Sequence, residues 1–435
     1  MEESVGPLWP ELHHRALEQA AASAPEFLAE LRREALARFT AHGFPTLKQE
    51  RWRFTDVSAL GGSSWKRIAE SPAPSGLPET MTALLEPSAY RLVFINGRLS
   101  PESRLPGAAD SFSIRMATEL RDGFLARVER RMRETAATMD APFAQINTAL
   151  AAESVVLTIP DRLTLLVPIE IVHYTDAPAA AVHPRVLLLM GERAEAQLLE
   201  VYGGSAGSDH FTNPLTDVVV GEASRLDHYI LQNEGAAAYH ISSTRATLGR
   251  DSRYTRWICD FGGRLVRHDL EVELADSAAE ANLFGLYMPK KRQHIDHHTT
   301  LRHLQPHTFS RQLYKGVLQD TSHSVFNGRI WVAREAQHTD AIQHNKNLLL
   351  SDEALADSQP QLEIFADDVR CTHGGTIGQM DQEGLFYLQS RGIGVERARQ
   401  IMVHAFAGEI TESIRLGSLR ERIGRMVHER LGREE

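Results

Sequence analysis

The sequence predicts a mainly β protein with helical segments at both ends. From about residue 154 onward, short β-favouring runs are separated by Gly, Asp, Asn and Pro, as in "RVLLLMGERAEAQLLEVYGG". Over these roughly 220 residues there is almost no convincing amphipathic helix, which excludes a βαβ architecture because its parallel strands need helical crossovers. A sandwich, a barrel or a β-solenoid remains, and the regular alternation of strand and turn favours the solenoid.

The N-terminal region, residues 1–153, is predicted to be mainly helical. In "SAPEFLAELRREALARFTAHGFP", Ser23 and Glu26 are expected to form a capping box, with Pro25 in the first turn. Apolar residues follow at near-helical spacing, and Gly43 supplies the stop. A second helical pattern runs through "ATELRDGFLARVERRMRETAATM".

The pattern becomes helical again near the C-terminus, which divides the rest of the chain into a β core (154–383) and a C-terminal helical region (384–435). In "VERARQIMVHAFAGEITESI" the apolar residues share one face of the expected helix. Its members are Ala398, Ile401, Met402, Ala405 and Phe406. This face could receive a partner protein, and packing on the end of the β core is an equally good interpretation.

Composition excludes several classes of protein. The net charge of −10 argues against a protein that binds nucleic acid through its phosphates. No apolar run approaches the length of a membrane span, and the start lacks the basic and apolar regions of a signal peptide. Two cysteines do not make a disulfide framework, so we expect a protein of a reducing compartment, the cytosol.

The motifs of the commoner enzyme classes are missing from the sequence. There is no G-x-x-x-x-G-K-[ST] P-loop, no G-x-G-x-x-G opening a helix after a strand and no G-x-S-x-G elbow. H-E-x-x-H and C-x-x-C are also missing. An ATPase of the P-loop kind is therefore excluded, although an unusual enzyme is not.

The first candidate metal site is "HIDHHTTLRHLQPH" (294–307), which holds five histidines. Imidazole and carboxylate ligands suit zinc or iron, and Asp296 and His298 share a face if the segment is a strand. One hypothesis is therefore a metal-dependent β-fold enzyme that uses these histidines. The alternative is that they lie at strand edges and turns and only form hydrogen bonds.

The second candidate is "ADDVRCTHGGTIG" (366–378), where Cys371 and His373 lie two residues apart. In a strand they project from the same face, as paired metal ligands often do. Two ligands do not close a tetrahedral site, which takes four. The pair is either half of a metal site or a buried cysteine and a hydrogen-bonded histidine.

A longer stretch carries a resemblance to a known family. "SVFNGRIWVAREAQHTDAIQHNKNLLLSDEALADSQPQLEIFADDVRCTHGGTIGQMDQEGLFYLQSRGI", together with "SRQLYKGVLQD" and "ERWRFTD", resembles the SufB/SufD family of iron–sulfur cluster assembly proteins. The segment "ADDVRCTHGG" is similar to the SufD branch of that family. The scarcity of cysteines agrees, because SufB is the branch expected to bring the essential thiol.

The resemblance implies a right-handed parallel β-helix flanked by helical N- and C-terminal regions. It also implies a complex with a SufB-like paralogue, joined through the β-helices, and a SufC-like ATPase docked on the C-terminal helices at about 384–435. His373 matches the family histidine near that junction, and Cys371 matches the cysteine two residues before it. The chain would then share iron or a transient Fe–S cluster with SufB, since such clusters need several thiolates.

The resemblance leaves other points open. A reduced flavin has been connected with complexes of this family, but the sequence holds no flavin motif. Pairing of two copies when SufB is missing is also open, because an exposed β-helix end invites it. A purely structural subunit, with Cys371 and His373 serving only for packing, is the main alternative.

Overall fold

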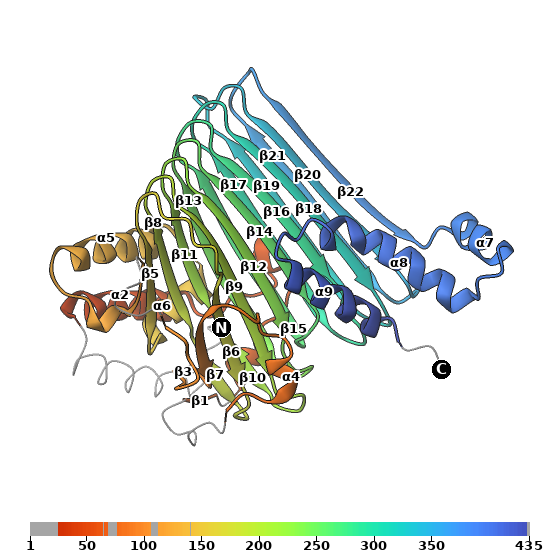
Figure 1. Ribbon diagram of the computed structural model, residues 1–435, viewed down its shortest axis with the longest axis horizontal. Coiled ribbons are helices and arrows are strands. Elements are labelled where there is room, and N and C mark those ends of the chain that lie inside the picture. Colours follow the sequence, from red (N-terminus) through yellow and green to blue (C-terminus); the bar gives the residue numbers. More distant parts are fainter. Residues whose placement is uncertain (1–24, 64, 68–75, 106–111, 140, 433–435) are drawn as a thin grey trace.

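The computed structural model describes residues 25–63, 65–67, 76–105, 112–139 and 141–432. Its centre is a solenoid of parallel strands that form two facing sheets (Figure 1). From β11 (Leu215–Val220) onward each strand of the core pairs with the strand two positions further along the chain, so successive strands alternate between the sheets; in the first coils the step is three, because β7 (Ala180–Val182) and β10 (His210–Thr212) intervene. This is the topology of a parallel β-helix, and the predicted β-helix flanked by helices is confirmed.

The core strands stack in register along both sheets. The first sheet contains β5 (Ser154–Ile159), β8 (Arg185–Met190), β11 (Leu215–Val220), β13 (Tyr239–Leu248), β15 (Leu265–Leu274), β17 (His294–His303), β19 (His323–Val332) and β21 (Leu355–Ile364). The second contains β6 (Ile169–Thr175), β9 (Glu195–Gly204), β12 (Arg225–Asn233), β14 (Arg253–Asp260), β16 (Glu280–Tyr287), β18 (Phe309–Leu318), β20 (Asp340–Leu349) and β22 (Arg370–Gln379). Short strands β1 (Lys66–Arg67), β7 (Ala180–Val182) and β10 (His210–Thr212) pair beside the first sheet.

Helices flank the solenoid on both sides. The N-terminal helices are α2 (Glu26–His42), α3 (Ser58–Gly62), α4 (Glu79–Thr82), α5 (Asp122–Thr138) and α6 (Pro142–Leu150), with 3-10 turns at Glu50–Trp52 and Ala117–Glu119. The C-terminal helices are α7 (Gln382–Ser390), α8 (Val395–Thr411) and α9 (Gly417–Arg430). None of the helices in these ranges combines the length and the apolar character that crossing a bilayer requires.

The ends of α2 allow a direct comparison with the sequence. The stop at Gly43 is confirmed: its φ of 69° suits glycine, and its N–H donates to the carbonyl of Phe39. Pro25 is the N-cap residue and no side chain caps this end. The predicted capping box cannot be followed further, because Ser23 lies outside the described residues.

The N-terminal region also supplies strands that its helical pattern did not predict. β2 (Tyr90–Ile95) pairs in parallel with β6, and β4 (Ser113–Met116) pairs antiparallel with β5. A short β3 (Arg98–Leu99) follows β2 in a hairpin. These strands extend both sheets at the N-terminal end of the solenoid, so its first core strands are not left as free edges.

Alternation along each strand puts one set of side chains into the interior. On the first sheet, one register column of inward-facing residues runs through six strands, and all six are apolar and buried. They are Leu188, Val218, Ala246, Val272, Leu301 and Ile330. Such stacked apolar residues supply the main stabilisation, at about 25 cal/mol per Å² of apolar surface removed from water.

Part of the interior is polar instead. Asp260 of β14 lies 2.9 Å from His268 Nε2 and 3.0 Å from His297 Nε2, and all three side chains are buried. Burial by itself raises the pKa of Asp260, but the two imidazoles outweigh it, so the pKa lies below its ordinary value. Burial lowers the pKa of His268 to about 4. His268 and Asp260 thus satisfy each other through a hydrogen bond where water is excluded.

The inward-facing His303 of β17 gives a prediction about pH. It is fully buried, and its ring nitrogens lie 2.8 Å from Thr308 Oγ1 and 3.0 Å from Ser310 Oγ. Burial lowers its pKa to about 3, whereas an unfolded histidine takes up its proton near pH 6.5. The unfolded chain therefore binds more protons between these values, and the free energy of unfolding falls as the pH drops through this window.

We expect this one group to remove about 2 kcal/mol between pH 7 and pH 5. In His303→Gln this contribution to the fall in the free energy of unfolding between pH 7 and pH 5 should be lost. Denaturant unfolding of the variant and the wild type at both pH values measures it. The control is His344→Gln, a change of an exposed histidine that should leave the wild-type difference in place. Equal pH dependence in His303→Gln and the wild type would contradict the prediction.

Candidate half-site at the open end of the solenoid

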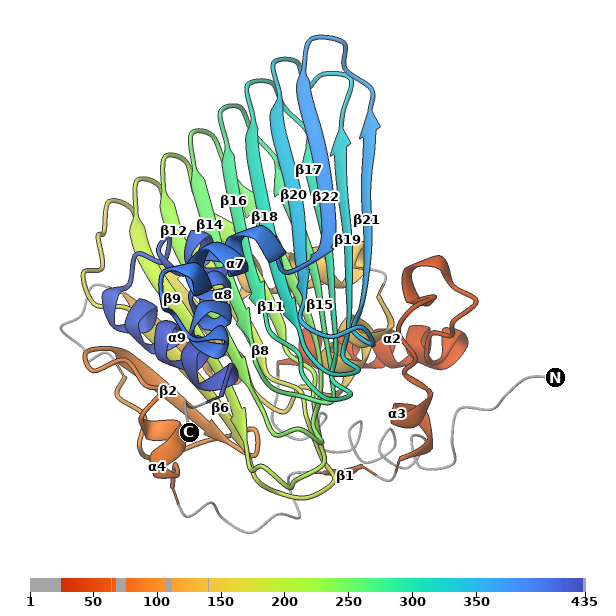
Figure 2. The same ribbon diagram turned by 90° about the vertical axis from the view of Figure 1, so that its right-hand side faces the viewer.

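The solenoid ends on β21 and β22, which are the last strands of the two sheets. Among the described residues no further strand pairs with their outer edges (Figure 2). The side chains of these last strands lack the burial of the strands before them: β18 is mostly buried, whereas β21 and β22 contain no buried residue. One end of the β-helix is therefore open.

Cys371 and His373 lie on this end. In the register of β20 and β22, Cys371 pairs with Ala341 and His373 pairs with Gln343. Ala341 and Gln343 are fully buried in the interior, and residues paired in register share a face. Cys371 and His373 therefore point along the same interior face, as predicted, but no coil covers them. Cys371 is half-buried and His373 is exposed.

The electrostatics of Cys371 favour the protonated thiol in the isolated chain. Burial raises the pKa of Cys371, and the nearby Asp340 raises it further. A metal takes the thiolate, so metal binding here would have to release a proton. The imidazole of His373 needs no such step when it is neutral.

Nothing in the described part of the chain completes the coordination of a metal ion around this pair. Within those residues no group of three or more His, Cys, Asp or Glu side chains could hold a metal ion. The second cysteine, Cys259, is buried between the second sheet and the C-terminal helices, in a different cluster from Cys371. Burial raises the pKa of its thiol as well. In the described part of the chain, Cys371 and His373 are therefore two potential ligands without a third.

The histidines of 294–307 do not converge, because strand alternation sends them in opposite directions. His297 and His303 of β17 point into the interior, whereas His294 and His298 lie on the outer face. His307 lies in the turn after the strand, with φ of 60°. A site that uses all five imidazoles is therefore not formed in the described structure.

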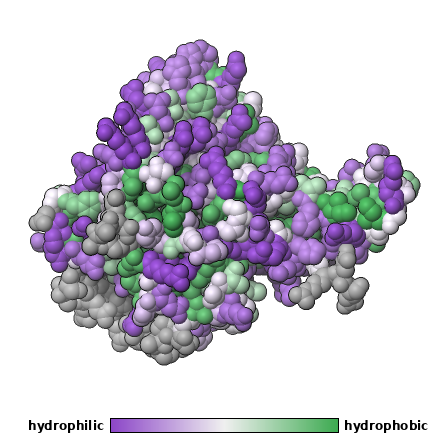
Figure 3. Space-filling model, viewed as in Figure 1, coloured by the Kyte–Doolittle hydropathy of each residue, from purple (hydrophilic) through white to green (hydrophobic). Residues whose placement is uncertain are grey.

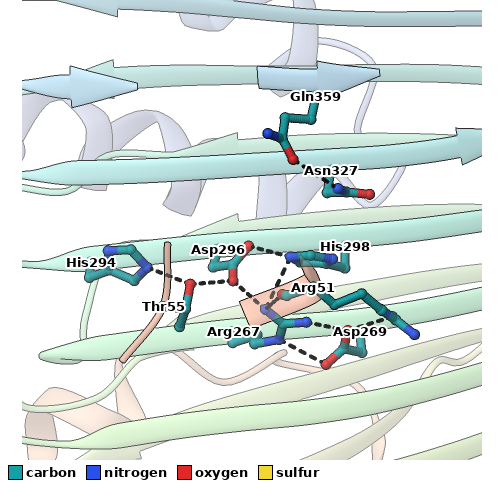
Figure 4. Close-up of polar contacts among 9 residues, drawn as sticks. All are labelled: Arg51, Thr55, Arg267, Asp269, His294, Asp296, His298, Asn327 and Gln359. Atoms are coloured by element: carbon teal, nitrogen blue, oxygen red, sulfur yellow. Dashed lines mark hydrogen bonds and ion pairs between the residues drawn. The ribbon is translucent and has the colours of Figure 1, made fainter. Parts of the chain in front are cut away.

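Asp296 and His298 share the outer face of β17, as predicted, within a structural ion network (Figure 4). The Arg267 guanidinium contacts Asp296 Oδ2 at 2.5 Å, and His298 Nε2 lies 3.0 Å from Oδ1. Thr55 donates to Oδ2 at 2.6 Å. Burial alone would raise the pKa of Asp296, but Arg267 and His298 hold it below its ordinary value. The buried arginine supplies the positive charge that a metal would otherwise bring.

The apolar stripe of α8, predicted as a docking face, is mostly directed at the rest of the chain. Ala398 is fully buried, and Phe406 packs over the Lys315 ammonium at 4.5 Å. Met402 lies against α7, while Ile401 lines the groove between α8 and α9. Ala405 alone in the stripe is exposed. The docking role is not tested by these contacts, but Ala398 and Phe406 serve packing.

Helix α7 carries exposed aromatic residues that the sequence analysis did not predict to form part of a docking face. Phe386 is 71% exposed and Tyr387 is 58% exposed. Apolar residues gather on the projecting tip that carries α7 (Figure 3). Exposed apolar faces of this kind are common at interaction sites of proteins. The signal in the sequence is the run "LFYL". Four consecutive apolar residues point in different directions around a helix, so they cannot all lie on one buried face.

The fold and the candidate site together define a class, a parallel β-helix with an open end that presents a cysteine and a histidine side by side. Residues 173–406 match the model of the SUF system FeS cluster assembly, SufBD core domain, and residues 8–171 match the SufBD protein N-terminal region. The chain therefore belongs to the SufBD family of iron–sulfur cluster assembly proteins, as the resemblance predicted.

Its relatives include SufD proteins. The iron–sulfur cluster assembly protein SufD of Escherichia coli is 30% identical over 393 residues, which cover 89% of this chain and 90% of the relative. A SufBD family protein of Synechocystis is 31% identical and covers 88% of this chain and 86% of its own length. The chloroplastic protein ABCI7 of Arabidopsis thaliana is 30% identical, over 85% of this chain and 79% of the relative.

Proposed function

We propose that this chain is a SufD-like scaffold subunit that works in the cytoplasm with a SufB-like paralogue and a SufC-like ATPase. It contributes His373, with Cys371, to a site for iron or a nascent cluster at the junction with the SufB-like subunit. The observation that carries the proposal is the position of both side chains on the interior face of the last, uncovered coil. Fe–S clusters need several thiolates, and a second β-helix could bring the missing ones.

The free edges of β21 and β22 support the proposal that the partner has the same β-helix architecture. Unpaired strand edges bind further strands, and large exposed apolar side chains at the same end would be buried by such a contact. They are Leu355 (61% exposed), Ile364 (38%), Phe365 (57%) and Ile377 (47%). In the absence of the SufB-like subunit, a second copy of this chain could pair with the same edge.

The C-terminal helices are suited to transmit force from an ATPase to the coils. Lys315 of β18 contacts Glu409 at 2.5 Å and donates to the carbonyl of Phe406 at 2.8 Å. Arg415 pairs with Asp227 of β12 at 2.9 Å. Helix α8 and the segment after it are therefore tied to the second sheet by ion pairs. ATP-driven movement of these helices would shift the open end and expose ligands, and the energy comes from the SufC-like subunit because this sequence has no P-loop.

The test is anaerobic co-expression of this chain with the SufB-like and SufC-like subunits of its organism, followed by iron and sulfide analysis of the purified complex. We expect the wild-type complex to carry cluster and His373→Ala to retain all three subunits with less than about a tenth of the iron, because a ligand is lost. His344→Ala, on the neighbouring strand, is the matched control and should load normally. Normal loading of the His373→Ala complex would instead support the purely structural subunit.

A further inference from the structure

Gln343 of β20 is a buried polar side chain that the proposed function does not use. It is fully buried, yet neither its Oε1 nor its Nε2 has a hydrogen-bond partner among the described residues. A buried amide is rarely left unpaired, because it loses its hydrogen bonds to water without replacement. Such a group therefore calls for a partner that the isolated chain does not supply.

The fold holds this amide directly beneath His373. The two residues are paired in register and share the interior face, and neighbouring strands lie only about 4.8 Å apart. Gly328 of β19 leaves the space that the amide fills, since a Cβ there would lie 2.1 Å from Gln343 Nε2. In the last coil Gly375 likewise places no side chain beside the imidazole.

The chemistry of a metal-binding histidine explains what the amide could do. When one imidazole nitrogen binds a metal, the other carries a proton, and its N–H is usually held by an acceptor that fixes the tautomer and the ring orientation. Deeper in the same interior, carboxylates accept from histidines, as Asp260 does with His268. A glutamine accepts through its carbonyl oxygen without placing another negative charge beside a thiolate-bound cluster.

We propose that Gln343 is a positioning residue for His373: once a partner covers the open end, Gln343 Oε1 accepts the ring N–H of His373 and fixes which nitrogen faces iron. This inference rests on the proposed function of His373. The hydrogen bond forms on assembly, because docking buries the imidazole and confines it above the amide. Gln343 itself does not touch the metal.

The experiment uses the three-subunit complex, loaded anaerobically with ferrous iron and sulfide. Gln343→Leu removes the acceptor at similar size, and we expect its complex to lose iron to a chelator at least ten times faster than the wild type. Gln312→Leu is the matched control. Gln312 is a buried amide one coil deeper in the same register column, bonded to Thr299 at 2.7 Å, and its change should leave iron loss unaltered.

Gln343→Glu separates positioning from packing. The carboxylate restores the acceptor, so iron retention should recover, but it favours the protonated imidazole and should move half-maximal loading to higher pH. If the Gln343→Leu complex fails to assemble, the pH dependence of iron loading in Gln343→Glu still tests the role of Gln343. An unchanged loading profile in Gln343→Glu, or wild-type iron loss in an intact Gln343→Leu complex, overturns the role of Gln343. The proposed function itself fails, and this role with it, if His373→Ala loads normally.

Discussion

Replacing Arg267 by leucine is expected to lower the free energy of unfolding by about 3–5 kcal/mol, because it leaves the buried Asp296 without its arginine and Asp269 with Arg51 alone. The guanidinium is almost completely buried and lies between Asp269, at 3.0 Å, and Asp296, at 2.5 Å. It also stacks on the ring of Trp52 at 3.7 Å, a cation–π contact within a desolvated site.

Denaturant unfolding of the full chain at neutral pH measures this loss. Arg329→Leu is the matched control: Arg329 lies on the outer face of the same sheet and pairs with Glu363 at 2.5 Å, but both side chains are about two-fifths exposed. Exposed pairs of this kind contribute about 0–1 kcal/mol. Adding Asp296→Asn to Arg267→Leu should restore part of the stability, because it removes one uncompensated charge. Equal losses in the two single variants would mean that the buried network is not stabilising.

The same network explains why "ERWRFTD" matters in this chain. Arg51 of that stretch contacts Asp269 of β15, and Thr55 contacts Asp296 of β17 (Figure 4). Trp52, from the same stretch, stacks on Arg267 of β15. The segment thereby attaches the N-terminal region to the outer face of the first sheet. Loss of Arg267 should loosen this attachment as well as destabilise the coils.

Strand alternation made part of the site predictable. It placed Cys371 and His373 on one face, and Asp296 with His298 on another, since residues two apart in a strand share a side. Strand alternation could not show that Cys371 and His373 lie on the last coil of the solenoid, because that position depends on which strands pair with one another in space. Nor could it show Arg267 beside Asp296. Those residues are 29 apart and meet through the register between coils, and the sequence has no strict repeat that reveals this register.

The C-terminal helices illustrate the same limit. The 3.6-residue period predicted a helix with one apolar face, and α8 has that face. The period does not tell whether the face meets another protein or the chain's own sheet. Phe406 of this face lies against the ammonium of Lys315, and the indole N–H of Trp257 donates to Ser413 just after the helix; both partners are distant in sequence. Tertiary packing therefore accounts for Phe406 and leaves the docking role of the stripe a prediction, while the exposed aromatic residues of α7 had no periodic signal.

The interior should also be sensitive to one added methyl group, at Gly316. Two tyrosines and two glycines pair reciprocally between β16 and β18: Gly285 lies beside Tyr314, and Tyr287 lies beside Gly316. A Cβ on Gly316 would lie 2.2 Å from a ring carbon of Tyr287. That ring cannot retreat easily, because it is fully buried, contacts the ring of His297 and donates from its hydroxyl to Asn347.

Gly316→Ala should therefore lower the free energy of unfolding by about 1–3 kcal/mol or more, as overpacking does. Gly378→Ala in β22 is the control, because a Cβ there meets nothing within 4 Å, and its effect should stay within about 0.5 kcal/mol. Denaturant unfolding of both variants compares the two positions. Asn347 pairs in register with Gly316 below and with Ile377 of the open end above, so the displaced ring should also disturb the last coil. Equal stability of the two variants would show that the ring has room to move, and that the coils beneath His373 are packed less tightly than their reciprocal glycines indicate.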